Sequence, residues 1–201
     1  MRLPGFLLAL GLTGLLALAT PIRPALADDA ASSFIAQTAD SVLKLARNSS
    51  LSQDQYKQQI HTIADQAFDA PRIAQFVLGR YWRTASPTER QQFVQAFENY
   101  MVQVYATRFR QYSGSTFKVV GQRQEGNSTM VTTEIAQPNS QQPARVIWQV
   151  GKGPNGYKIT DVSIEGISQA ITYRQEFNSV IEQHNGQVSA LIQQLQQKAN
   201  G

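Results

Sequence analysis

The 201-residue sequence contains no cysteine. This absence excludes disulfide bonds, cysteine-ligated zinc sites, thiol nucleophiles and a lipid anchor on an N-terminal cysteine. Histidine is nearly as scarce, since only His61 and His184 are present. The two fall in separate predicted helices, with no His, Cys or paired carboxylate at ligand spacing. We therefore expect neither a metal site nor a cofactor.

Charged residues make up only 16% of the chain, and its formal net charge is +4. Two of the 18 basic residues, Arg2 and Arg23, lie in a segment that we expect to be removed, which leaves a net charge of +2 against 14 acidic residues. The remaining Lys and Arg residues are scattered singly. A nucleic-acid partner is therefore not expected, because such proteins cluster their basic residues.

The N-terminus has the pattern of an export signal. Arg2 supplies a short positive region, residues 6–19 form an apolar run, and small residues at Ala25 and Ala27 precede an acidic pair. We expect residues 1–27 to be a cleaved signal peptide and residues 28–201 to form one exported domain. A retained anchor helix is the alternative, but the run is shorter than the roughly 20 residues that a spanning helix needs.

Hydrophobic periodicity of three to four residues predicts helices on both sides of a central block. The expected helices lie at residues 30–47, 52–68, 69–78, 87–111, 169–185 and 188–195. Ser52 with Gln55 and Ser86 with Glu89 have capping-box spacing, which predicts where two helices begin. Gly79 suits the left-handed residue that ends a helix.

The central block alternates with period two. Four strands are expected at residues 116–120, 129–136, 144–150 and 157–164, joined by turns short enough for an antiparallel meander. The sequence thus predicts an α+β fold in which a helical layer packs on a curved, antiparallel four-stranded sheet and encloses an apolar cavity.

Three short motifs suggest enzymes but have simpler interpretations. The glycines of residues 151–156 have dinucleotide-binding spacing, but a strand rather than a helix follows, so a hairpin turn is favoured. Ser168 sits in a near match to a nucleophile elbow, yet only His184 follows it, and a helix cap is favoured. For Asp161 and Glu165 we favour an ion pair with Arg80, Arg83 or Arg174 over acid–base catalysis.

Two longer blocks place the chain in a family. The run RIAQFVLGRYWR at residues 72–83, and the run ITDVSIEGIS at residues 159–168 followed by YRQEF at 173–177, resemble the MlaC, or toluene-tolerance, family of periplasmic phospholipid-binding proteins. The resemblance extends over residues 28–195. A hopanoid-associated branch of lipid carriers looks similar as well.

The resemblance implies a soluble periplasmic carrier that shuttles phospholipid between an outer-membrane lipoprotein complex and an inner-membrane ABC transporter complex. It also implies acyl chains enclosed between helices and sheet, with the head group toward solvent. The implied role is transport of a bound lipid cargo, with no catalysis.

The patterning suggests which side chains line the cavity. The candidates are the bulky apolar residues near Gly79, on the long helix and on the strands: Phe76, Leu78, Tyr81, Trp82, Phe97, Met101, Tyr105, Val131, Ile135, Val146, Trp148, Val162, Ile164 and Ile167. Arg80 and Arg83 are candidates for a head group or an ion pair, because guanidinium groups suit phosphate.

Two other classes of function stay open at this point. One is a small exported hydrolase that uses Ser168 or the Asp161 and Glu165 pair. The other is a structural envelope protein that docks a partner through its glutamine-rich C-terminal helix.

Overall fold

The computed structural model describes residues 29–138 and 140–200. The expected signal peptide and its cleavage point lie outside the described residues. The helices before the sheet are α1 (Asp29–Arg47), α2 (Gln53–Ala67), α3 (Ala70–Leu78), α4 (Tyr81–Thr84) and α5 (Pro87–Arg110). The strands are β1 (Thr116–Glu125), β2 (Ser128–Ala136), β3 (Ala144–Gly153), β4 (Gly156–Ile164) and β5 (Ile167–Ser168), and α6 (Gln169–Gln183) and α7 (Val188–Asn200) follow them.

The helix starts confirm the predicted caps. The Ser52 hydroxyl accepts from the Gln55 amide while the Gln55 side chain accepts from the Ser52 amide, and Ser86 and Glu89 repeat this arrangement. Asp69 caps α3 by accepting from the Arg72 amide. Each cap satisfies amides that have no partner inside the helix, so the local sequence sets these boundaries.

Gly79 ends α3, as expected, with a backbone φ of +59° and ψ of −123°. Side chains with a Cβ rarely adopt this conformation, so glycine permits the turn. The sequence predicts no helix between Gly79 and Ser86, whereas the structure has the one-turn α4 there. Four residues are too few to show a helical period, which is why the pattern missed it.

The sheet is an antiparallel meander of five strands in the order β1-β2-β3-β4-β5. The α+β class is confirmed, but the four-strand count is wrong. The two-residue β5 pairs with the end of β4, through Ser163 with Ser168 and Ile164 with Ile167. The first strand also continues to Glu125, past the predicted end at Val120. The prediction stopped too early because a bulge between Val119 and Gly121 breaks the two-residue alternation of side chains.

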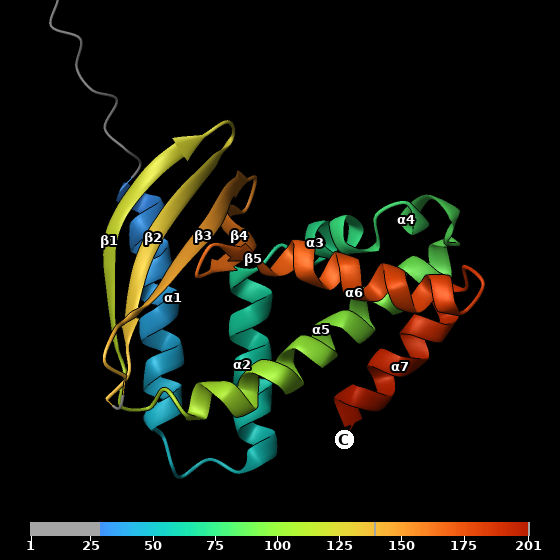
Figure 1. The fold of residues 1–201 in the computed structure, drawn as a ribbon. Coiled ribbons are helices and arrows are strands. Elements are labelled where there is room, and N and C mark those ends of the chain that lie inside the picture. Colours follow the sequence, from blue (N-terminus) through green and yellow to red (C-terminus); the bar gives the residue numbers. More distant parts are fainter. Residues whose placement is uncertain (1–28, 139, 201) are drawn as a thin grey trace, which may run out of the picture.

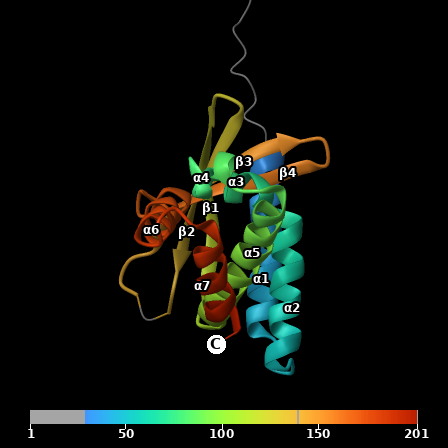
Figure 2. The same cartoon turned by 90° about the vertical axis from the view of Figure 1, so that its right-hand side faces the viewer.

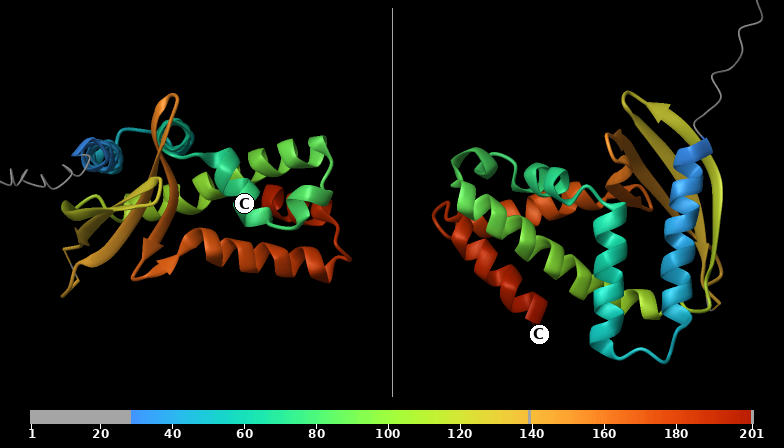
Figure 3. Two further views of the ribbon diagram at one scale, coloured as in Figure 1. Left: turned by 90° about the horizontal axis from the view of Figure 1, so that it is seen from above. Right: turned by 180° about the vertical axis from the view of Figure 1, so that it is seen from behind.

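The helices form two groups rather than one layer on the sheet. Figure 1 shows α1 and α2 side by side next to the strands, while α6 runs away from the sheet toward α3 and α4. Figure 2 shows α7 alongside α5, and the two views of Figure 3 show α5 extending from the sheet into the second group. The long α5 therefore connects the two parts.

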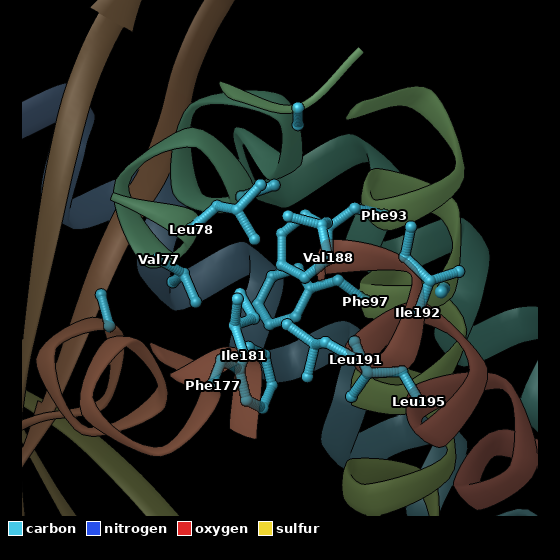
Figure 4. Packing of buried hydrophobic residues seen from close by; sticks show 14 residues of the cluster. Val77, Leu78, Phe93, Phe97, Phe177, Ile181, Val188, Leu191, Ile192 and Leu195 are labelled. Carbon is cyan, nitrogen blue, oxygen red and sulfur yellow. The ribbon is translucent and has the colours of Figure 1, made fainter. Parts of the chain in front are cut away.

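Buried side chains form three clusters that match this arrangement. One is purely helical, with residues from α3, α5, α6 and α7 (Figure 4). A second joins α1 and α2 to the sheet through residues such as Ile35, Val131 and Ile159. A third joins α1, α2 and the C-terminal half of α5 around Tyr56. Helix α5 contributes one side to the first cluster and another side to the third cluster. Its apolar residues therefore do not form a single stripe.

Candidate functional site

One face of the sheet packs against α1, and we call it the inner face. Ala31 and Ile35 of α1 bury Val131, Val150 and Ile159, and the ring of Phe34 lies 6.2 Å from that of Tyr157. Ser32 adds a hydrogen bond of 2.6 Å to Gln122 of β1. The N-terminal half of α1 thus covers one end of the inner face.

The six predicted strand residues all project from this inner face. The pairing register places Val131 opposite Trp148 and Trp148 opposite Val162, while Val146 lies opposite Ile164. Side chains directly opposite one another in a sheet share a face, and Ile135 shares it with Val131 by the two-residue alternation. These six residues therefore lie on one face of the sheet, and a bulge opposite Val150 brings Ile159 to that face as well.

The row of apolar groups extends beyond the part that α1 covers. Val131 is fully buried under α1, and Trp148 and Val162 pack at the border of the same cluster. Ile135, Val146 and Ile164 continue the row outside the three buried clusters, and Ile135 and Ile164 are only half-buried. This end of the inner face is apolar yet incompletely covered by the chain itself.

Thr133 is a fully buried hydroxyl in the middle of the row. It donates to the Val146 carbonyl at 3.2 Å and accepts from the Trp148 indole nitrogen at 2.9 Å. The indole is thereby held in one orientation, and no polar atom of this trio is left unpaired. Alternation placed Thr133 on the inner face, but nothing in the sequence indicated its role in fixing Trp148.

The candidates on α5 run from the helical core into the C-terminal half of that helix. Phe97 is buried, whereas Met101 and Tyr105 are half-buried. The hydroxyl of Tyr105 lies near that of Tyr173 on α6, close enough for the two groups to influence each other's pKa. Burial raises the pKa of Tyr105, and burial followed by the neighbouring Tyr105 raises the pKa of Tyr173 further. Both phenols therefore stay neutral, and their hydroxyls are polar groups without charge among aromatic side chains.

The candidates around Gly79 belong to the helical cluster rather than to the inner face. Leu78 is fully buried there, and Tyr81 and Trp82 pack on it, as Met101 also does. The predicted set is therefore divided: some candidates belong to the helical cluster, Val131, Trp148 and Val162 to the cluster under α1, and Ile135, Val146, Ile164 and Tyr105 lie outside the clusters. Phe76 and Ile167 also lie outside them, since they are 42% and 63% exposed.

The two candidate arginines have different surroundings. Arg80 forms an ion pair with Glu182 at 2.6 Å and donates to the Tyr81 hydroxyl at 2.8 Å. Arg83 is exposed, and its carbonyl accepts from Arg90. The ion-pair role foreseen for Arg80 is thus present, but its partner lies on α6 and is neither Asp161 nor Glu165.

The ion pair predicted for Asp161 is wrong. Its carboxylate accepts from the Ser168 hydroxyl at 2.5 Å and from the amides of Val162 and Ala170 at 2.7 and 3.0 Å. Glu165 accepts from the Arg145 amide. Asp161 therefore joins the end of β4 to the first turn of α6, a contact that backbone amides make and sequence spacing does not reveal.

Ser168 is the cap of α6, as predicted, because its hydroxyl accepts from the Ile171 amide. His184 caps the opposite end of that helix, and His61 pairs with Asp65 on α2. Within residues 29–138 and 140–200, no three metal-binding side chains gather. No helix of the same residues combines the length and hydropathy needed to cross a membrane.

The family model described as "MlaC protein" matches residues 36–197, which is most of the chain. The chain belongs to the MlaC family. The resemblance read from residues 72–83 and 159–177 is thereby confirmed. The first MlaC block runs from α3 into α4, and the second runs from β4 through β5 into α6. A hydrogen bond of 3.0 Å from the side-chain amide of Asn178 to the Val77 carbonyl connects α6 with α3.

The chain is similar in sequence to a known protein and in structure to another. The "Intermembrane phospholipid transport system binding protein MlaC" of Haemophilus influenzae is 23% identical over 128 residues, which are 62% of this chain and 59% of that protein. The match thus spans about three fifths of that MlaC. A phospholipid-binding protein of Ralstonia solanacearum, solved in complex with a phospholipid, has a TM-score of 0.73 at 24% identity, covering 84% of this chain and 96% of that one. This likeness shows that the two share a fold.

Proposed function

We propose that this chain is a periplasmic carrier that binds phospholipid by its acyl chains and shuttles it between outer-membrane and inner-membrane ABC transporter complexes. Membership of the MlaC family supports the proposal, as do the name of the Haemophilus relative and the phospholipid held by the Ralstonia protein. The observation that carries it is the apolar row on the inner face, which continues past α1 to half-buried Ile135 and Ile164.

The physical need for such a carrier is large. Exposing an acyl chain to water costs a free energy of about 0.8 kcal/mol per methylene group. Moving two long chains through water therefore meets a barrier on the order of 20 kcal/mol. An incompletely covered apolar surface between sheet and helices lowers that barrier, because the chains replace water there. Neutral groups such as the Tyr105 and Tyr173 pair add no charge to this surface.

The proposed acyl-chain contacts are the inner-face row together with the three candidates on α5. They comprise Val131, Ile135, Val146, Trp148, Val162, Ile164, Phe97, Met101 and Tyr105, with Leu78, Tyr81 and Trp82 supporting them from the helical cluster. Arg83 is the better head-group candidate, because Arg80 is already engaged with Glu182.

The direct test is lipid extraction. Protein purified without detergent from the periplasm is expected to release phospholipid into organic solvent, and native mass spectrometry is expected to show a lipid-sized addition to the chain. A hopanoid in the extract would show that the bound lipid is not a phospholipid, but it would still support a carrier function. A bare polypeptide mass together with an empty extract would contradict the carrier itself.

A pair of variants on opposite faces of the sheet locates the site. Ile164→Asp places a charge on the inner face, and Ile147→Asp places one on the other face at another half-buried isoleucine. We expect Ile164→Asp to lower bound lipid by about tenfold or more, since a carboxylate beside acyl chains is strongly disfavoured. Ile147→Asp should retain lipid, and equal losses from both variants would move the site away from the inner face.

A further inference from the structure

Two of the large apolar side chains that are exposed in the described residues lie beside the same depression. Among the described residues, four large apolar side chains are exposed: Phe76, Val120, Ile167 and Ile171. Phe76 lies on α3, Ile167 on the short β5 and Ile171 in the first turn of α6, whereas Val120 lies on the edge strand β1. Scattered apolar residues are ordinary on a surface, but grouped ones mark interaction sites.

The surface between α3 and α6 is hollowed. A depression of about 460 Å³ is lined by Phe76, Ile171, Arg174, Gln175 and Asn178. We call this depression the α3–α6 patch. Its lining contains two apolar groups, two amides and one cation, and no carboxylate. A partner that fits it must therefore present an apolar group together with a negative charge.

Arg174 is free to meet such a charge. In the described part of the chain the ion pairs involve other residues, so no carboxylate neutralises this guanidinium. The guanidinium lies 5.0 Å from the centre of the Phe76 ring. A Cβ at Gly79 would come within 3.1 Å of its nitrogens, so glycine lets the arginine lie close against the backbone. Arg174 is thus held in place before any partner arrives, which lowers the entropy lost on binding.

We propose that the α3–α6 patch docks a protein segment that inserts an apolar side chain beside an Asp or Glu. The hollow with its unpaired guanidinium favours a protein segment, because the recess receives one protruding apolar side chain while Arg174 meets one carboxylate. The proposal rests on the proposed carrier function, since docking is the step at which cargo passes to or from a membrane complex.

Site-specific photo-cross-linking in the native host tests the patch. A benzophenone amino acid replaces Gln175 in the full chain, and the matched control carries it at Val120, the exposed apolar residue far from the patch in sequence and element. We expect a protein adduct from position 175 only, with an Asp or Glu in the cross-linked partner peptide. Vesicles of equal parts phosphatidylglycerol and phosphatidylcholine serve as the membrane probe in a flotation assay.

Two charge variants in the cross-linking chain decide the matter. Ile171→Asp and Arg174→Glu should each reduce the adduct by about tenfold or more, whereas Arg174→Lys should keep most of it. Changing the partner's carboxylate to lysine should restore the adduct of Arg174→Glu. Ile171→Asp is the safer variant for folding, because an acid in the first turn of α6 is favoured by the helix dipole.

Other outcomes overturn the proposal. An equal adduct at Val120, an adduct insensitive to both variants, or flotation of the chain with vesicles that Ile171→Asp abolishes would each reject a protein-docking patch. Lipid content is measured on the same samples. If Ile171→Asp strips the cargo, the patch belongs to the lipid site instead. If the unaltered chain holds no lipid yet gives the charge-dependent adduct, the carrier function fails and the docking surface stands.

Discussion

At the scale of single residues, Thr133 shows how a polar group can serve an apolar surface. Its hydroxyl donates to Val146 and accepts from Trp148, and it is completely buried. The Thr133 hydroxyl accepts the hydrogen bond of the indole N–H, which is the only polar group of the Trp148 ring. The ring therefore presents only apolar surface to whatever lies on the inner face. Valine would fill the same space without either hydrogen bond.

We therefore expect Thr133→Val to destabilise the protein by about 1–3 kcal/mol, because it leaves the buried indole N–H without an acceptor. The control is Thr132→Val, which changes the neighbouring half-buried threonine on the opposite face of β2 and should alter stability by only about 0.5 kcal/mol. Urea unfolding followed by circular dichroism measures both. A Thr133→Val chain as stable as the control would show that the hydrogen bonds contribute nothing net.

At the scale of elements, the corner between α3 and α4 depends on Gly79. The backbone there has a positive φ, and Arg174 of α6 packs directly against the position where a Cβ would be. Asn178 adds hydrogen bonds to the Val77 and Arg174 carbonyls. The corner and α6 are thus fixed to each other, although about a hundred residues separate them in sequence.

Gly79→Ala should cost about 1–3 kcal/mol, since it combines backbone strain with a contact against the Arg174 guanidinium. Gly126 provides a matched comparison, because its φ of +56° is nearly the same but open space surrounds its Cβ position. Gly126→Ala should cost only the strain, about 1–2 kcal/mol. Thermal unfolding of both variants separates the cost of backbone strain from the cost of the contact with Arg174. Equal changes in melting temperature would mean that Arg174 moves aside freely.

At the scale of the whole molecule, the chain has three buried clusters and a part of the inner face that belongs to none of them. In the carrier function proposed above, a bound lipid covers this part of the inner face. Cargo should therefore act as part of the core. Ligands that bind only the folded state stabilise it in proportion to the logarithm of their saturation.

Removal of the lipid is accordingly expected to lower the melting temperature. Cargo at a hundred times its Kd contributes about 2.7 kcal/mol, which corresponds to roughly 5–10 °C for a chain of this size. Calorimetry of extracted and lipid-loaded protein measures the difference. The Ile164→Asp variant offers the control, because it should melt at the same temperature before and after extraction.

Local sequence features were sufficient for most element boundaries. Caps such as Ser52, Ser86 and Asp69 act within three residues, and strand alternation puts Val131, Thr133 and Ile135 on one face whatever surrounds them. The features that failed were also local. The bulge in β1 interrupted the alternation, and α4 and β5 were too short to carry any period.

The sequence by itself determined the longer helices, the faces of β2 and β3 and the family blocks, because each depends on residues close together in the chain. Only the tertiary structure decided which contacts form between distant residues, such as Arg80 with Glu182, and Arg174 with Phe76 and Gly79. It also decided which apolar candidates are buried and which, like Phe76 and Ile167, are exposed. The physical reason is that apolar side chains are interchangeable in a periodic pattern, and packing alone selects the partner that each one meets.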